Sequence, residues 1–112
     1  MPFITVKTNQ NIFEQKTIIK SELGKAITAI PGKSETWLMV ELEGNKDMYF
    51  KGSNEPCAMF EVAIFGTANS DAYENLTKKI CDISTKYLNV PADRTYVKYS
   101  EIDNWGYNNF NF

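Results

Sequence analysis

Two hydrophobic periods alternate along the chain, and together they predict strands separated by helices. In residues 2–8, Ile4 and Val6 alternate with polar side chains, which is the two-residue period of a strand that begins almost at the N-terminus. Three further segments rich in apolar side chains predict strands at residues 36–43, 57–66 and 94–100.

Two segments between these strands have the three- and four-residue spacings of amphipathic helices. Their apolar positions are Ile19, Leu23, Ile27 and Ile30 in the first segment, and Tyr73, Leu76, Ile80, Ile83 and Tyr87 in the second. Asn11, with Glu14 three residues later, predicts a capping box before the first helix, and Asn69 predicts the start of the second. Proline-containing turns at 31–32 and 91 predict where the helices end.

The two halves of the chain repeat the order strand, helix, proline-containing turn, strand. This tandem βαβ pattern predicts an α+β fold in one domain, residues 1–112, with a four-stranded mixed sheet and both helices on one face. The other sheet face would be bare and would expose Met39, Met59, Phe65 and Tyr96. Packing several copies of the sheet around a symmetry axis would cover these side chains.

The last nine residues, NWGYNNFNF at 104–112, are rich in aromatic side chains and carry no charge. A disordered tail is rarely so aromatic. We therefore expect this tail either to dock on a neighbouring copy or to line a pocket.

The composition is that of an ordinary globular protein, and it excludes several kinds of site. A net charge of −2 and a single arginine, Arg94, argue against a nucleic-acid partner and against a phosphate clamp. The chain has no histidine, the usual general base and metal ligand. Cys57 and Cys81 are too few for a disulfide framework or a zinc site, so we expect two reduced, buried thiols and no metal or organic cofactor.

The first 25 residues contain charged side chains at short intervals, and no long apolar run follows them. We therefore expect no signal peptide, no membrane contact and a cytoplasmic protein. Export would need a non-classical route.

Without histidine, the residues that could serve as a general base include the terminal amine. Aminopeptidases remove an initiator methionine that precedes a small residue, and Pro2 qualifies. A free α-amino group has a pKa of about 8, and burial or a nearby cation lowers it, so Pro2 could be a neutral base near pH 7. Lys33 follows the turn that enters the second strand. In a parallel βαβ unit this turn lies at the same sheet edge as Pro2, although an ordinary solvated lysine would have the same local sequence.

Five short motifs follow one another along the chain: MPFI at the start, PGK at 31–33, GSNEPCA at 52–58, PADRTYVKY at 91–99 and WGYNNFNF at the end. Together they resemble the macrophage migration inhibitory factor family of the tautomerase superfamily. The resemblance covers residues 1–112, with a small deletion before Asn104.

The resemblance implies a homotrimer with active sites between neighbouring subunits. It implies keto–enol tautomerisation of phenylpyruvate-type, and in some members dopachrome-type, keto acids. The N-terminal Pro2 would be the base and Lys33 would bind the substrate. Further pocket residues implied by the resemblance are Phe65, Tyr96, Trp105, Tyr107 and Phe112.

Two positions depart from the mammalian members. Lys98 stands where they often have asparagine, and it shares a strand face with Tyr96, so it would either bind an anionic substrate or point into water. Cys57 lacks the second cysteine of the CxxC motif, so no thiol–disulfide activity is expected.

Other functions remain open at this point. The first alternative is a cytokine-like binding protein with residual tautomerase activity, for which a receptor would be the partner after export. A related dehalogenation or decarboxylation would typically use additional arginines, and Arg94 is the only one. A purely structural trimer is the third alternative.

Overall fold

A central sheet with two helices on one of its faces makes up most of the protein. The computed structural model describes all residues, 1–112. The four strands are β1 (Pro2–Thr8), β2 (Met39–Glu43), β3 (Ala58–Phe65) and β4 (Thr95–Ile102), and the helices are α1 (Lys16–Ala26) and α2 (Ser70–Ile83). Two short strands, β5 (Gly106–Tyr107) and β6 (Phe110–Asn111), form a separate hairpin in the tail. The predicted α+β fold is therefore confirmed.

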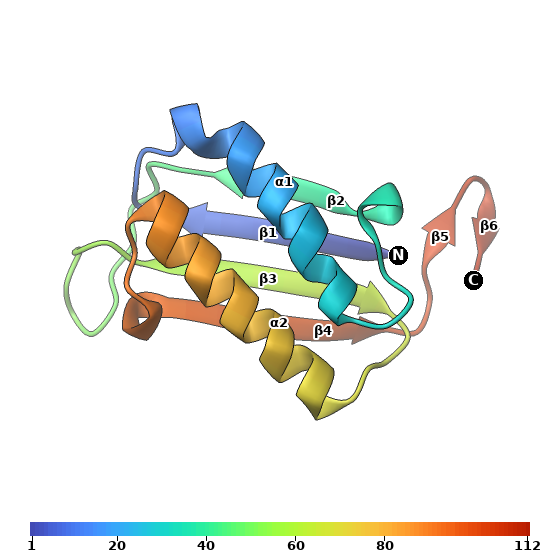
Figure 1. Cartoon of the computed structure of the whole chain (residues 1–112). Helices are drawn as coiled ribbons and strands as arrows, with labels where there is room; N and C mark the ends of the chain where they lie inside the picture. The colour runs from blue at the N-terminus through green and yellow to red at the C-terminus, as the bar shows by residue number, and fades with distance from the viewer.

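The sheet is mixed, with strand order β2-β1-β3-β4 (Figure 1). Strand β1 is parallel to β2 and antiparallel to β3, and β3 is parallel to β4. Each parallel pair is joined by one helix, as a βαβ unit requires. The register pairs Pro2 with Ile64 at one end of the sheet, and Lys7 with Met59 near the other.

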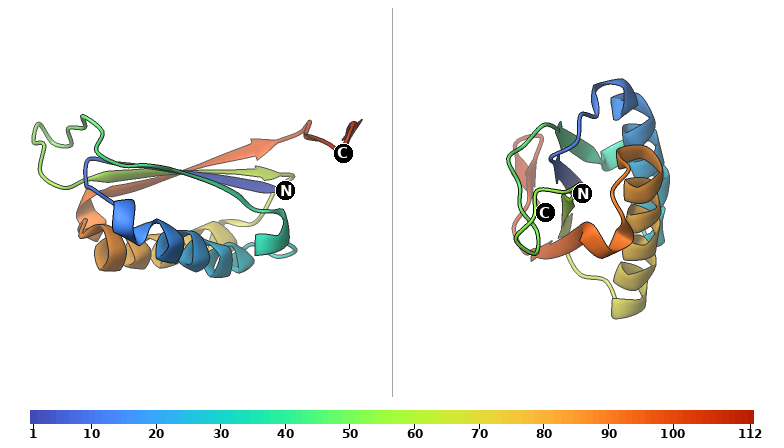
Figure 2. Two further views of the ribbon diagram at one scale, coloured as in Figure 1. Left: turned by 90° about the horizontal axis from the view of Figure 1, so that it is seen from above. Right: turned by 90° about the vertical axis from the view of Figure 1, so that its left-hand side faces the viewer.

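The core lies between the sheet and the two helices, which cover the same face (Figure 2). Strand β3 alternates buried and half-buried side chains, with Phe60 and Ile64 among those turned to the helices. On the helices, Leu23 and Leu76 are completely buried in the same core cluster as these strand side chains. The sequence predicted this arrangement: every second side chain of the strands, and every third or fourth side chain of the helices, faces the core.

Two local predictions are wrong. Asn11 accepts a hydrogen bond from the backbone of Phe13 over 3.1 Å, two residues on, so it forms a local turn and no capping box with Glu14. A 3₁₀ turn, Phe13–Gln15, then precedes α1. The second predicted strand begins three residues late, because Glu35–Trp37 form another 3₁₀ turn.

At the start of α2 the prediction is confirmed. The Asn69 side chain accepts a hydrogen bond from the Ala72 amide over 2.8 Å, which satisfies one of the free N–H groups of the first helical turn. The helix continues after Ile83 as a single wider turn and ends at Asn89, whose φ of 56° is left-handed.

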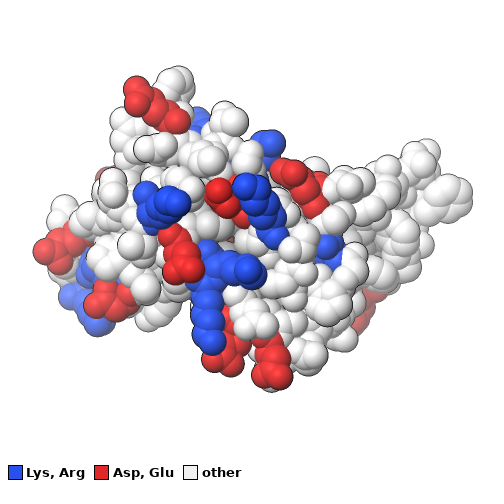
Figure 3. All heavy atoms as spheres, in the orientation of Figure 1, with Lys and Arg blue, Asp and Glu red and all other residues white.

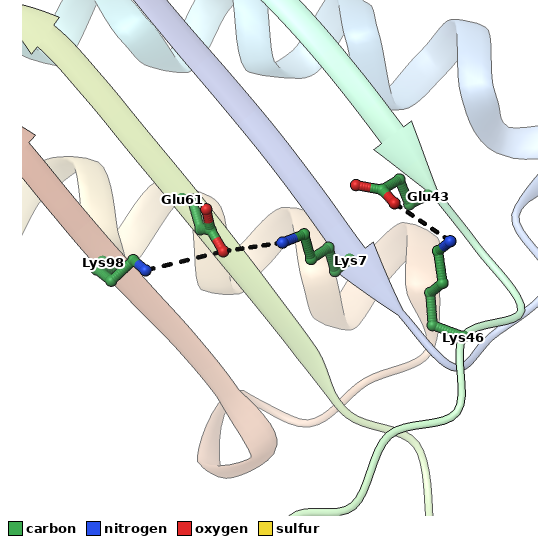
Figure 4. Close-up of polar contacts among 5 residues, drawn as sticks. All are labelled: Lys7, Glu43, Lys46, Glu61 and Lys98. Carbon is green, nitrogen blue, oxygen red and sulfur yellow. Dashed lines mark hydrogen bonds and ion pairs between the residues drawn. The ribbon is translucent and has the colours of Figure 1, made fainter.

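The second sheet face has no helix on it, as predicted (Figure 2). Met39 and Tyr96 are 66% and 58% exposed on this face, and Met59 and Phe65 are half-buried. The structure adds a charged stripe between these apolar side chains. The Glu61 carboxylate lies 3.2 Å from the Lys7 ammonium and 3.9 Å from that of Lys98, across β1, β3 and β4 (Figure 4).

The helical face carries lysines and carboxylates side by side, and the tail beyond β4 shows no charge in the same view (Figure 3). No helix of the structure is long and apolar enough to cross a membrane.

Candidate active site

A cavity of about 630 Å³ opens at the end of the sheet where β1 begins and β3 ends. Aromatic side chains from three distant segments form most of its wall. The lining residues are Met1, Trp37, Phe65, Tyr107, Asn108, Phe110, Asn111 and Phe112. The tail thus lines a pocket, one of the two alternatives expected for it, and docking on a neighbouring copy stays a prediction.

Ring contacts hold the tail against this wall. The Tyr107 ring meets Trp37 edge to face, with centroids 5.2 Å apart, and stacks with Phe112 at 6.3 Å. Phe112 in turn lies 5.7 Å from Phe65, the last residue of β3. The tail folds back on itself through a hydrogen bond from the Phe112 amide to the Trp105 carbonyl, 2.9 Å long. An aromatic wall of this kind suits a flat, apolar ligand.

The N-terminus lies at the wall of the cavity, which Met1 lines and Pro2 does not. Pro2 is buried as the first residue of β1, and Met1 projects beyond it and lines the cavity. The Met1 carbonyl accepts a hydrogen bond from the Phe65 amide over 3.0 Å. With Met1 attached, the nitrogen of Pro2 belongs to an amide, and the only free amine at the site is that of Met1.

Lys33 reaches the same place from the turn after α1. Gly32 has a φ of 81°, a left-handed conformation that favours glycine, and the Lys33 amide donates to the Ile30 carbonyl over 3.1 Å. This tight turn directs the side chain to the sheet end, where the ammonium donates to the Phe65 carbonyl over 3.0 Å. The predicted proximity of Lys33 to the N-terminus is thus present in the fold.

Burial lowers the pKa of the terminal amine below its usual 8.0, and the charge and hydrogen bonding of Lys33 lower it further. Both effects disfavour the protonated amine. The sheet end therefore favours a neutral, basic nitrogen at the terminus of the chain.

Tyr96 and Lys98 do not join this group within one chain. The register places Tyr96 opposite Met59, five residues along β3 from the partner of Pro2, which corresponds to roughly 17 Å. The Tyr96 ring contacts Phe50 at that far end, with centroids 4.9 Å apart. Lys98 lies midway along β4 beside Glu61 (Figure 4).

Trp105 stands at the base of the tail hairpin and does not line the cavity within one chain, so its pocket role stays a prediction. Two aromatic lining residues, and with them Asn108 and Asn111, were missed by the sequence analysis. Trp37 was assigned to a strand, and Phe110 was noted only as part of an aromatic tail. A signal for Phe110 was present in the spacing of residues 107, 110 and 112 along a hairpin, whereas nothing local marks Trp37.

The only arginine, Arg94, makes structural hydrogen bonds within the chain. Its guanidinium donates to four backbone carbonyls, those of Phe50, Ser53, Glu55 and Pro56, over 2.8–3.1 Å. Arg94 therefore ties the loop before β3 to the start of β4 and has few donors left for a ligand.

Cys57 is buried and Cys81 half-buried, and both are free thiols. No group of three or more histidine, cysteine or carboxylate side chains is arranged to hold a metal ion. The chemistry at this end of the sheet is thus an amine and an aromatic wall in the cavity, with the Lys33 ammonium beside them on the Phe65 carbonyl.

Comparison with known proteins gives the same family throughout. The family model described as macrophage migration inhibitory factor matches residues 1–110. The chain is 31% identical to macrophage migration inhibitory factor of Xenopus laevis, covering 100% of this chain and 99% of that protein. It is 26% identical to the homolog of Brugia malayi, covering 92% and 90%.

Solved structures of the same name share the fold. The structure of MIF2 from Leishmania major superposes with a TM-score of 0.91 at 28% identity, covering 100% of this chain and 97% of that one. The macrophage migration inhibitory factor-like protein of Entamoeba histolytica, at 19% identity, has a TM-score of 0.87 and covers 99% and 98%. From its N-terminal cavity to its aromatic tail, the chain belongs to the macrophage migration inhibitory factor family of the tautomerase superfamily.

Proposed function

We propose that the protein is a keto–enol tautomerase of phenylpyruvate-type keto acids, with Pro2 as general base after Met1 has been removed. Membership of the family supports a tautomerase or a cytokine-like role. The observation that favours the enzyme is that burial, and then Lys33, lower the pKa of the Met1 amine, one residue from the nitrogen of Pro2, where Met1 lines an aromatic cavity. A general base near neutral pH needs this combination.

Removal of Met1 would change the site in two ways. It would turn the nitrogen of Pro2 into a secondary amine at the place where the pKa of a terminal amine is lowered. It would also free the Phe65 N–H, which now donates to the Met1 carbonyl. Two donors would then lie at Phe65: its own backbone N–H and the Lys33 ammonium, which binds its carbonyl oxygen. Such a pair is suited to a substrate carboxylate.

In the proposed reaction the neutral Pro2 nitrogen takes a proton from the carbon next to the keto group. Negative charge moves to the keto oxygen, where Lys33 and a phenol from Tyr96 stabilise it as the enol forms. The protonated Pro2 then gives its proton to that oxygen, which completes the enol and leaves Pro2 neutral, and the reverse reaction follows the same steps backwards. The rings of Phe65, Tyr107 and Phe112 contact the aromatic ring of the substrate and exclude water.

Tyr96 can take part only if a second copy brings it to the cavity, because it lies at the far end of its own sheet. We propose the homotrimer for this reason and for the exposure of the bare sheet face. Lys98, on the same face, would bring a second cation toward the anionic substrate if the neighbouring Glu61 leaves it room.

The test compares three proteins in a phenylpyruvate tautomerase assay, each checked by intact mass for the loss of Met1. Pro2→Gly keeps a terminal amine but not the ring, and a chain extended by Gly-Ser before Pro2 keeps the ring but has an amide nitrogen. We expect the wild type to be active, the extended chain to be inactive and Pro2→Gly to lose most activity. Full activity in the extended chain would sink the assignment of the base.

A cytokine-like role makes a different prediction for the same proteins. Binding to cells or receptor that persists in Pro2→Gly and in the extended chain, together with no tautomerase activity in the wild type, would favour that alternative.

A further inference from the structure

A cluster of hydrogen bonds lies where the end of β4 meets the start of α2. The Tyr73 hydroxyl donates to the Glu101 carboxylate over 2.6 Å, and the Ala68 amide lies 3.4 Å from the same carboxylate oxygen. Glu101 is the penultimate residue of β4 and thus stands at the root of the aromatic tail.

The same cluster is supported from the helix side. The Tyr73 and Tyr99 rings lie 4.6 Å apart, and the Tyr99 hydroxyl donates to the Tyr73 carbonyl over 3.0 Å. Thr77 is within 2.7 Å of the Tyr99 hydroxyl. Both α2 and β4 therefore hold Tyr73 in place. Its hydrogen bond to Glu101 in turn holds the end of β4, from which the tail continues.

Glu101 is joined to the cavity on both sides along the chain. On one side, the Ile102 carbonyl accepts a hydrogen bond from the Gly66 amide over 3.1 Å, and Gly66 directly follows Phe65 of the cavity wall. On the other side, residues 103–112 lead into the rings of Tyr107 and Phe112.

Within one chain, the tail is held by a few ring contacts and keeps much of its surface exposed. Tyr107, Phe110 and Phe112 are 48%, 74% and 54% exposed, and the hairpin they form is only two residues wide on each strand. A two-stranded hairpin is marginal by itself in water. Within one chain, the direction in which the tail leaves the sheet is therefore set by its ring contacts with Trp37 and Phe65 and by the contacts at its root.

We propose that Tyr73 and Glu101 act as positioning residues, whose hydrogen bond fixes the root of the aromatic tail and so sets the affinity of the cavity for an aromatic substrate. The effect on substrate affinity rests on the proposed function, whereas the effect on the position of the tail does not. Neither residue lines the cavity, and none of their side-chain hydrogen bonds goes to Pro2 or Lys33. Loss of their bond should thus weaken binding of substrate and transition state alike, which raises KM and leaves kcat nearly unchanged.

The test uses Tyr73→Phe, Glu101→Ala and Glu101→Gln in the full-length protein. Tyr73→Phe and Glu101→Ala remove the bond, and we expect KM for phenylpyruvate to rise about three- to tenfold, the range that one hydrogen bond to a charged or neutral group supplies. Glu101→Gln keeps an oxygen that can accept from Tyr73, and we expect it to restore most of the affinity. A matched control is Tyr87→Phe, which removes a tyrosine–glutamate contact to Glu22 on the outer helical face, 3.4 Å long.

Hydrogen exchange of the amides at 105–112 provides a readout that needs no activity. We expect faster exchange there in Tyr73→Phe and Glu101→Ala, and wild-type exchange in Tyr87→Phe. If KM and tail exchange are both unchanged in Tyr73→Phe and Glu101→Ala, the inference is wrong. If the wild type has no tautomerase activity, the proposed function fails, and tail exchange alone then decides the inference.

Discussion

The Lys33 ammonium donates a hydrogen bond to the carbonyl oxygen of Phe65 over 3.0 Å. This contact joins the turn after α1 to the last residue of β3, thirty-two positions along the chain, and it places a cation beside the N-terminal amine. The amine, the cation and the aromatic wall meet at one end of the sheet because β1 begins there, β3 ends there and the first crossover returns there.

Replacement of Lys33 by Met removes the charge and keeps most of the length of the side chain. Burial, and then Lys33, lower the pKa of the Met1 amine, so the loss of Lys33 should also raise the pKa of Pro2 once Pro2 is the terminal amine, and the acid limb of the pH profile of kcat/KM should move to higher pH. KM for phenylpyruvate should rise as well, because an anionic substrate loses a donor. The measurement is the rate between pH 5 and 9; an acid limb that stays in place would exclude Lys33 as the source of the shift.

Trp37→Ala tests the wall residue that the structure adds to the site. Its edge-to-face contact with Tyr107 would be lost, and the tail would lose one of its few supports. We expect KM for an aromatic keto acid to rise about two- to tenfold, the range of one aromatic pair, with a smaller change for pyruvate itself. Phe13→Ala is a suitable control, because that ring is 75% exposed beside α1 and away from the cavity.

Subunit mixing tests whether Tyr96 acts across an interface. Pro2→Gly and Tyr96→Ala should each be weakly active alone. Unfolded together and refolded, they should regain activity, because some sites would combine an intact Pro2 from one copy with an intact Tyr96 from another. Activity that never exceeds the sum of the two separate variants would show that Tyr96 does not complete a site between copies.

The Tyr73 phenol gives a test at high pH. Burial, and then the hydrogen bond and charge of Glu101, raise its pKa from 10.0 to about 12. The folded state thus holds this proton more tightly than the unfolded chain, so its contribution to stability is complete below about pH 10 and is lost between about 10 and 12. Absorbance titration of the phenolates should show a step at about 12 that is missing in Tyr73→Phe. A titration with no such late step would contradict the geometry of the bond.

Asn69→Ala should lower the free energy of unfolding by about 1 kcal/mol, the usual value of a side-chain cap at a helix N-terminus. The reason is the lost acceptor for the Ala72 amide. Urea titration measures the change, and Asn75→Ala serves as a control within the same helix, since its side chain caps no helix end. Equal effects of the two substitutions would show that the cap contributes nothing particular.

The order of strands and helices was predictable, because the side chains that face the single core recur every second residue in a strand and every third or fourth residue in a helix. Ile4 and Val6 on β1, and Leu76 and Ile80 on α2, are completely buried where the periods required it. The repeat of the βαβ unit then left few sheet orders to consider.

The start of β2 was not predictable from the same pattern. Alternation continues through Trp37, but the chain turns there, with hydrogen bonds from Trp37 to the Ser34 carbonyl and from Leu38 to the Glu35 carbonyl. These are local contacts that binary patterning does not report. The turn is what points the Trp37 ring toward Tyr107, so the missed turn and the missed wall residue have one cause.

The pairing of Glu61 with both Lys7 and Lys98 depends on the register of three strands, which the sequence does not specify. Lys33 is the opposite case. Its place beside the N-terminus follows from the parallel pairing of β1 and β2, so one correct topological prediction was enough to find it. The roles of Tyr96 and Lys98 at a shared site stay predictions, because a single chain keeps both away from Pro2.

The central claim is that Pro2 becomes the base when Met1 is removed, and the most direct measurement is the tautomerase rate of one sample before and after that removal. The protein would be made by cell-free synthesis without methionine aminopeptidase and then treated with it, and intact mass would give the fraction of chains that begin at Pro2. The account predicts almost no activity in the untreated chain and a rate that rises in proportion to that fraction. An untreated chain as active as the treated one would contradict it.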